Sequence, residues 1–262
     1  MINILIRSSI LVIMALGMRK IFEQTVPRRI WVYLRMVVIV RFLFPVNIQI
    51  PLLFKRINHQ GMEGNTKPIP PLQNLPLFGF LLIVWILGVL CGCIVTGKMI
   101  HREMILLKDA ISYESIDGKD IVRSLSLTKK KIRIVVTDKV QSPCVCGVIH
   151  PVIVLSEDSI NKNRIVLSHV ITHEIMHIIH YDNLFKMLGM IAVILYWFDP
   201  FVWLMFITMS KDIELACDED VLSHIGREYN NDYVLSLLLI ADRKGVLSSF
   251  STGFGKKSLI ER

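Results

Sequence analysis

The sequence is poor in cysteine and in charged residues. Five of its 262 residues are cysteines, and 20% are charged. Cys91 and Cys93 lie in a long apolar run, and Cys144, Cys146 and Cys217 lie in a segment that we expect to face the cytoplasm, where thiols stay reduced. Cys144 and Cys146 would place both sulfurs on one face of a strand, but no second pair lies near them in the sequence to complete a metal site. A disulfide framework is therefore excluded.

The sequence also lacks the features of a nucleic-acid-binding protein. Its formal net charge is +8, with 30 basic and 22 acidic residues. Neither an arginine-rich recognition helix nor an aromatic stacking motif accompanies the basic residues. Membrane topology and anionic lipid explain the charge, so we expect no direct nucleic-acid partner.

Hydrophobic residues, by contrast, are abundant. They make up 53% of the sequence and the mean hydropathy is +0.53, outside the usual range of a soluble domain. We expect an integral membrane protein with three N-terminal transmembrane helices, at about residues 2–18, 30–52 and 77–98. The core of the third, residues 79–97, is about long enough to cross the hydrocarbon. The alternatives are a cleaved signal peptide for the first span and a buried helix of a soluble domain for the second.

Two arginines interrupt the second span. A charge inside the bilayer costs free energy, although a long side chain near the end of a span can reach the headgroups. Arg35 is close enough to an end for this. Arg41 lies deeper and would need a partner or a water-filled pocket, so no role is assigned to it.

Basic residues beside the spans set the expected orientation, because cytoplasmic loops are enriched in lysine and arginine. The loop between the first two spans carries Arg19, Lys20, Arg28 and Arg29, and the exit of the third span carries Lys98, Arg102 and the run Lys129-Lys130-Lys131. We therefore expect a multi-pass protein of the plasma membrane, with its N-terminus outside and its active site facing the cytoplasm.

The most informative motif is His173-Glu174-Ile175-Met176-His177, an HExxH. Residues four apart share a helix face, so the two imidazoles can converge on one ion. In zinc peptidases three protein ligands leave the fourth position to a water of lowered pKa, and the glutamate takes a proton from this water as it attacks a carbonyl. The motif predicts that His173 and His177 bind Zn²⁺ and that Glu174 is the general base.

The surrounding sequence supplies the helix that the motif requires. An apolar stretch over residues 164–172 leads into it, and Asn161 or Asn163 can cap its start. Upstream, residues 131–135 alternate as a half-buried strand does, and residues 152–155 form a short buried strand. We expect a small sheet beside the helix, and we hypothesise that its edge strand holds an extended substrate by main-chain hydrogen bonds.

A second apolar segment follows the motif and is interrupted by Asp199-Pro200. A single crossing here would carry any later ligand to the far side of the membrane. A re-entrant helical hairpin at about residues 185–212 avoids this, because Asp199 can cap a returning helix that begins at Pro200. From Pro200 to Glu214 that helix rises about 21 Å at roughly 1.5 Å per residue, less than the ~30 Å hydrocarbon core.

The returning helix carries the candidate third ligand, Glu214. Glu214 and Asp218 are four residues apart, so one can bind zinc while the other accepts a hydrogen bond from a ligating imidazole. An ordinary solvated acidic cluster is the alternative, and the open two-histidine site favours Glu214 as ligand and Asp218 as its supporting residue.

We expect Cys217 to point away from the Glu214 face. His169 and His180 are expected to pack or to be solvated, their other interpretation being alternative ligands or transition-state donors.

Together these features resemble the BlaR/MecR membrane zinc metallopeptidases, the family that includes beta-lactam sensor-transducers. The resemblance rests on four segments and on the strands and spans that precede them: the HExxH of residues 173–177, Asp182-Asn183, the turn at residues 197–203, and residues 214–219. It implies a mainly α fold with a gluzincin-like zinc peptidase domain. It also implies that His173, His177 and Glu214 are the zinc ligands, that Glu174 is the base, and that Asp218 supports the site.

The expected organisation has three parts. Residues 1–98 form the membrane region, residues 99–222 a cytoplasm-facing peptidase domain that includes the hairpin, and residues 223–262 a C-terminal helical or tail segment. Drug-sensing members of the family continue into another span and a penicillin-binding domain, for which no room remains after residue 222. We therefore expect no beta-lactam binding by this chain, which is either a fragment or a protein with another stimulus.

The leading functional hypothesis is a membrane-embedded zinc endopeptidase in signal transduction, which cleaves itself or a cytoplasmic regulator such as a transcriptional repressor. One alternative is housekeeping proteolysis of membrane proteins with a similar ligand set. Another is a non-catalytic receptor or scaffold, against which the adjacent glutamate argues, because structural zinc sites more often use four protein ligands. The substrate, the activating signal and the oligomeric state are not readable from the sequence.

Overall fold

Helices dominate the part of the chain that the structure describes. The computed structural model describes residues 12–14, 17–19, 22, 26–44, 75–108, 110–113, 132–140, 142–161, 163–226 and 230–241. Most of the first expected span and the end of the second lie outside these residues. The elements are α2 (Arg28–Leu43), α3 (Leu75–Lys108), β1 (Ile111–Ser112), β2 (Arg133–Thr137), β3 (Cys144–Cys146), β4 (Val152–Ser156), α5 (Glu157–Ile160), α6 (Arg164–Ile179), α7 (Asp182–Leu195), α8 (Pro200–Ile225) and α9 (Asn230–Ala241).

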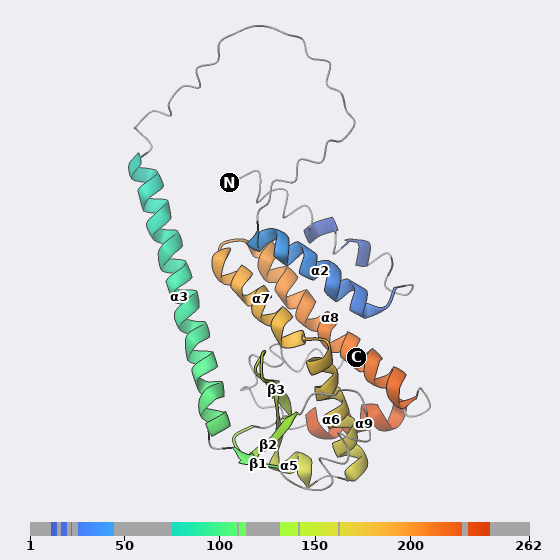
Figure 1. Cartoon of the computed structure of the whole chain (residues 1–262). Helices are drawn as coiled ribbons and strands as arrows, with labels where there is room; N and C mark the ends of the chain where they lie inside the picture. The colour runs from blue at the N-terminus through green and yellow to red at the C-terminus, as the bar shows by residue number, and fades with distance from the viewer. Residues whose placement is uncertain are drawn as a thin grey trace.

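The long helix α3 covers the residues of the third expected span and is a candidate membrane helix. Its segment Gly79–Ile105 is the one helix among the described residues that is by itself long and apolar enough to cross a membrane, and its most apolar stretch is exposed. Helices α6 and α7 meet this criterion only as a pair bent by 57°. Figure 1 shows α3 standing beside the other helices instead of inside them. The described part of the second expected span lies in the shorter helix α2, which packs in a bundle with α7 and α8 and does not meet this criterion.

The bundle of α2, α7 and α8 has its own apolar core. Buried side chains from all three helices meet there, among them Val32, Ile39, Val193, Met205 and Met209. Arg35 lies inside this bundle with only 1% of its surface exposed, and it forms an ion pair with Asp212 of α8. The expectation that Arg35 reaches the headgroups is wrong, because a buried carboxylate on the facing helix neutralises its charge.

The hairpin that the sequence predicts after the HExxH motif is present. Helix α7 ends at Leu195, the chain turns, and α8 begins at Pro200. Asp199 caps α8 as expected, since its side chain accepts a hydrogen bond of 2.9 Å from the Phe201 N–H. The two helices pack against each other, so the start of α7 and the middle of α8 come back to the same end of the bundle (Figure 1).

The tip of this hairpin lies against α3. A Cβ added at Gly88 would overlap the Trp197 indole, and the Trp85 Nε1–H donates to the Leu195 carbonyl at 3.0 Å. From Trp85 to Gly97 a helix rises about 18 Å. The tip therefore contacts α3 inside its apolar segment, Gly79–Ile105.

This contact predicts a specific effect of enlarging Gly88. Gly88→Leu forces the new side chain into the Trp197 ring, and overpacking of this kind costs about 1–3 kcal/mol of stability. Gly97→Leu is the matched control on the same helix, because nothing lies within 4 Å of a Cβ there. We expect a lower melting temperature in detergent for the Gly88 variant alone. Equal melting temperatures for the two variants would contradict the described contact.

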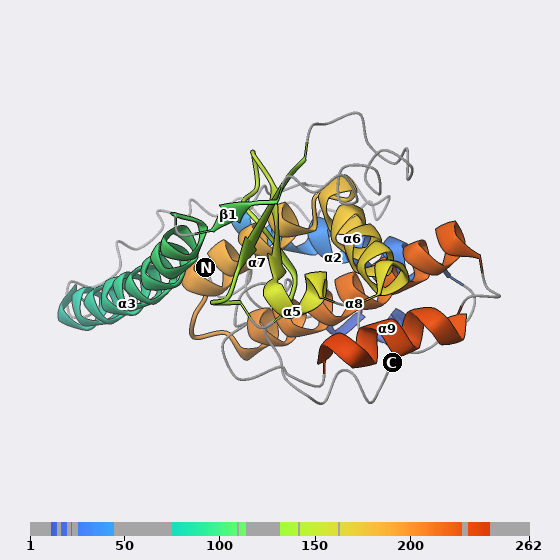
Figure 2. The same ribbon diagram turned by 90° about the horizontal axis from the view of Figure 1, so that it is seen from below.

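A four-stranded sheet lies beside α6, with the strand order β1-β2-β4-β3. Strands β2 and β4 are parallel, while β3 is an antiparallel edge strand. Strand β4 contains the predicted strand at residues 152–155, and β2 overlaps the predicted strand at residues 131–135 from Arg133 onward. Helix α6 covers the sheet through a buried cluster that includes Ile153, Leu155, Val170, Ile171 and Ile175. Figure 2, which views the molecule from below, shows the sheet together with α6 and α9. The expected N-cap of α6 is Asn163, whose side chain accepts from the Ile165 N–H.

Candidate metal centre

The two histidines of the HExxH motif converge in the interior of the protein. His173 and His177 lie one turn apart on α6, and their Nε2 atoms are 3.2 Å apart. Both residues are buried, each with 8% of its surface exposed. Zinc-bound nitrogens lie about 2.0–2.1 Å from the ion, so two nitrogens of a tetrahedral site are about 3.3 Å from each other. The spacing of the imidazoles fits one shared metal ion.

The hairpin brings Glu214 of α8 to the same point. Its Oε2 lies 3.8 Å from the His173 Nε2, and its Oε1 lies 3.9 Å from the His177 Nε2. Two neutral imidazole nitrogens and a carboxylate are a donor set that zinc accepts, with room for a fourth ligand. The structure therefore places the three residues that the sequence proposes as ligands around one position.

A lysine stands beside the proposed carboxylate ligand. The Nζ of Lys186 on α7 lies 3.1 Å from the Glu214 Oε1. Burial alone would raise the pKa of Glu214, but the positive charge of Lys186 holds this pKa well below its ordinary value. Glu214 is consequently a carboxylate at neutral pH, the form that a metal ligand needs. No motif or spacing in the sequence singles out Lys186.

The second nitrogen of His177 is held by Asp182. The His177 Nδ1–H donates to the Asp182 Oδ2 at 2.7 Å, and Asp182 is completely buried. Tyr181 makes this contact possible, because its left-handed backbone (φ 56°) turns the chain between α6 and α7 and returns Asp182 to the histidine. A carboxylate on Nδ1 fixes the tautomer that leaves Nε2 free for a metal.

The second nitrogen of His173 is held from another direction. Its Nδ1 lies 2.9 Å from the hydroxyl of Tyr233 on α9 and 3.3 Å from the Asp218 Oδ1. The Tyr233 hydroxyl donates to that Asp218 oxygen at 2.9 Å. The Tyr233 hydroxyl therefore accepts a hydrogen bond from the His173 imidazole N–H and donates one to Asp218. Asp218 lies where a supporting acid was expected, whereas Tyr233 comes from the segment expected to be a helical tail.

Cys217 does not lie as the sequence predicts. Its side chain is completely buried, and its Sγ lies 3.6 Å from the His173 Nδ1 and 3.3 Å from the His173 carbonyl oxygen. The expectation that Cys217 points away from the Glu214 face is wrong. Residues three apart on a helix are neighbours on one face, so Cys217 is turned only slightly away from Glu214. Cys217 thus forms a second possible ligand set with His173 and His177.

The other two histidines near the motif make different contacts. The His169 Nδ1 lies 2.9 Å from the Ser236 hydroxyl of α9, and its ring packs against Tyr233. The His180 Nε2 lies 3.2 Å from the Asp220 Oδ2 of α8. These contacts hold α9 and α8 against α6, in keeping with the expected packing role.

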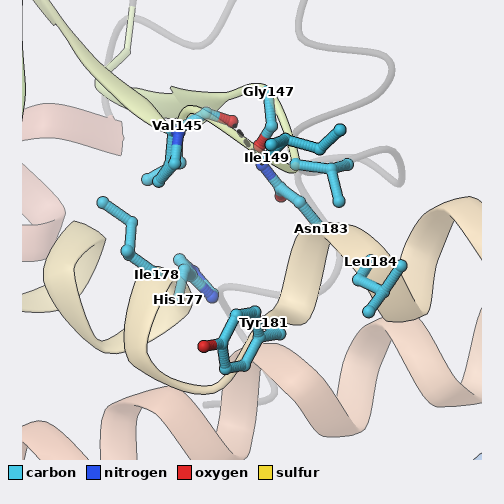
Figure 3. A pocket seen from close by; sticks show the side chains of 10 residues that line it. Val145, Gly147, Ile149, His177, Ile178, Tyr181, Asn183 and Leu184 are labelled. Carbon is cyan, nitrogen blue, oxygen red and sulfur yellow. Dashed lines mark hydrogen bonds between the residues drawn. The ribbon is translucent and has the colours of Figure 1, made fainter.

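A pocket of about 380 Å³ opens beside His177 (Figure 3). Its walls come from β3, from the loop after β3, and from the turn between α6 and α7, and they are lined by Val145, Gly147, Val148, Ile149, Pro151, His177, Ile178, Tyr181, Asn183 and Leu184. Most of these side chains are apolar. The Asn183 amide donates to the Val145 and Gly147 carbonyls at 3.0 Å each, which ties the edge strand to α7.

Comparison with known proteins identifies the family of the chain. A family model described as BlaR1 peptidase M56 matches residues 55–262. The chain belongs to the BlaR1 peptidase M56 family. This membership confirms the resemblance inferred from the motif, the turn and the acidic segment of α8.

Two of the curated relatives illustrate how much of such a protein the chain represents. It is 26% identical over 164 residues to the methicillin resistance mecR1 protein of Staphylococcus aureus (strain Mu50 / ATCC 700699), a match covering 60% of this chain and 28% of the relative. It is 26% identical over 183 residues to the regulatory protein BlaR1 of Bacillus licheniformis, covering 65% of this chain and 30% of the relative. The chain thus matches less than a third of the length of either relative.

Proposed function

We propose that this chain is a membrane-embedded zinc endopeptidase whose active site faces the cytoplasm. The observation that carries the proposal is the convergence of His173, His177 and Glu214, three separate donors on two helices, beside the glutamate of the motif. A zinc ion held by these residues would supply a Lewis acid and a water of lowered pKa. Family membership supports the same reaction class.

Each remaining residue of the site has a defined task in peptide hydrolysis. Glu174, which is buried with 7% of its surface exposed, takes a proton from the attacking water and delivers it to the leaving amine. Asp182 keeps the Nδ1 proton on His177, and the Tyr233–Asp218 pair keeps it on His173. Both Nε2 atoms are thereby kept in the metal-binding form.

The pocket beside His177 fits an apolar side chain of a peptide substrate. Its lining is dominated by Val145, Val148, Ile149, Ile178 and Leu184, so burial of an apolar side chain there would stabilise the bound peptide. The Val145 and Gly147 carbonyls already accept from Asn183. We propose that β3 guides the peptide main chain and that the pocket selects the residue next to the scissile bond.

The substrate class that we propose is a protein in a regulatory pathway, either the chain itself or a cytoplasmic regulator such as a repressor. Support comes from the family and from a relative named as the regulatory protein BlaR1. A position of the site near the cytoplasmic membrane surface, where a cytoplasmic protein can reach it, is part of this proposal, and the contact of the hairpin tip with the apolar segment of α3 supports it.

Metal removal tests this proposal directly. The full chain in lipid nanodiscs is incubated with a mixed peptide library before and after treatment with a zinc chelator, and the cleavage sites are mapped by mass spectrometry. We expect cleavage next to apolar residues, loss of cleavage on chelation, and recovery when Zn²⁺ is added back. Cleavage that persists in zinc-free protein, or no cleavage by zinc-loaded protein, would refute the zinc peptidase.

A further inference from the structure

We propose that Arg29 of α2 is a positioning residue for the metal centre, acting on His177 through Asp182. The inference rests on the proposed function, because it takes His177 as a metal ligand. It adds to that function a residue of the membrane region, far in sequence from the HExxH motif and from the hairpin.

Arg29 and His177 share one buried carboxylate. The Arg29 Nη1–H donates to the Asp182 Oδ1 at 2.8 Å, while the His177 Nδ1–H donates to the Asp182 Oδ2 at 2.7 Å. Asp182 has no exposed surface, and Arg29 has only 8%. The two oxygens of Asp182 are thus divided between the guanidinium and the imidazole, and the carboxylate has a fixed orientation.

The positive charge of Arg29 stabilises the buried Asp182 carboxylate in the orientation that accepts the hydrogen bond from His177. A fully buried carboxylate is costly unless it is paired with a cation and hydrogen-bonded. Without Arg29, Asp182 would lose this ion pair and the hydrogen bond to its Oδ1, and the Asp182 carboxylate would be free to rotate. Rotation weakens the hydrogen bond from the His177 Nδ1–H, which sets the tautomer and basicity of the ligand.

The guanidinium is itself fixed from its other side. Its Nε and Nη2 donate to the Asp220 Oδ2 of α8 at 3.1 and 2.5 Å. The same Asp220 oxygen lies 3.2 Å from the His180 Nε2. A planar fork that serves two carboxylates in this way requires arginine, because the point charge of lysine cannot reproduce both contacts.

Helix α2 carries Arg29 to this position and is held there independently. The backbone N–H of Arg28 donates to the Glu219 Oε2 of α8 at 3.1 Å, and Arg35 pairs with Asp212 further along the helix. The apolar face of α2 is buried in the bundle with α7 and α8. Arg29 is therefore presented to Asp182 by a docked helix, and its contact with Asp182 is separate from the contacts that dock the helix.

The test measures metal affinity, without any peptidase assay. Zinc affinity of the full chain in nanodiscs is determined by competition with a chromophoric chelator, and the ligand geometry is followed by the visible spectrum of bound Co²⁺. We expect Arg29→Ala to weaken zinc binding about 10- to 100-fold, as losses of a ligand's hydrogen-bonding partner do, and to change the Co²⁺ spectrum. Arg29→Lys should recover part of the affinity. Arg133→Ala, at an exposed position of β2, is the matched control and should bind zinc like the parent.

A purely structural role for Arg29 gives a different result. Arg35→Gln removes another ion pair of α2 without touching Asp182, so it should lower the melting temperature and leave zinc affinity nearly unchanged. Equal losses of zinc affinity in Arg29→Ala and Arg35→Gln, or unchanged affinity in Arg29→Ala, would overturn the proposal. Arg29-dependent zinc binding by a chain that cleaves nothing would sustain the positioning role and overturn the proposed peptidase.

Discussion

Replacing Glu174 with glutamine should remove peptidase activity while the protein keeps its zinc. The substitution preserves the size of the side chain and leaves all three proposed ligands in place, but an amide cannot accept a proton from the attacking water. General acid–base catalysis contributes about 10²- to 10⁴-fold, so we expect the rate of cleavage to fall by at least about 100-fold. The measurement combines single-turnover cleavage of a mapped peptide with zinc analysis of the same sample.

The control for this substitution is Glu157→Gln, which makes the same chemical change at an exposed position at the start of α5. It should cleave like the parent. Full activity in zinc-loaded Glu174→Gln would show that another group is the base. Loss of zinc from that variant would instead show that Glu174 holds the metal, and the roles proposed for it and for Glu214 would have to be exchanged.

Replacing Glu214 with alanine should abolish tight zinc binding, whereas replacing Cys217 with alanine should not. Both residues lie on α8 and both approach the two histidines, so they define two competing ligand sets. Glu214 faces the Nε2 atoms of both imidazoles. The Cys217 Sγ instead lies near the Nδ1 of His173, the nitrogen that the Tyr233 hydroxyl already engages. The geometry therefore favours the carboxylate as the third ligand.

The two variants are compared by zinc content after dialysis and by chelator competition. Loss of one of three protein ligands should exceed the 10- to 100-fold effect expected for a residue that only supports a ligand. Activity should disappear in Glu214→Ala and be largely kept in Cys217→Ala. The reverse pattern would assign the site to two histidines and a cysteine, and zinc retained by both variants would mean that neither side chain is essential to the site.

Local patterns in the sequence were sufficient to predict the core of the site. The spacing of His173 and His177 and the cap and proline at Asp199 and Pro200 are short-range signals, and each depends only on helix geometry. The two histidines need a third ligand, and this need led to the prediction of both Glu214 and the hairpin that returns it. In the structure His173, His177 and Glu214 lie around one position, and Asp199 caps α8.

The residues that sequence reasoning missed are joined by contacts across the fold. Arg29 meets Asp182, and Tyr233 meets His173, over separations in sequence for which no periodicity exists. The same holds for Arg35, whose buried partner Asp212 belongs to a helix that follows far later in the chain. A single sequence shows that such a charge needs a partner but does not show which carboxylate provides it. The position of Cys217 differs from the prediction for another reason, because Cys217 is three residues from Glu214 and therefore shares its helix face.

The supports of the two imidazoles come from helices that lie far apart in the sequence, and this determines when the centre can be completed during synthesis. Arg29, the partner of Asp182, is made before the HExxH helix, but Tyr233 emerges from the ribosome after the HExxH helix and the whole hairpin. Until then the Tyr233 hydroxyl, which links the His173 imidazole to Asp218 by two hydrogen bonds, is missing. Translation itself therefore delays the finished centre until nearly all of the described structure has been made.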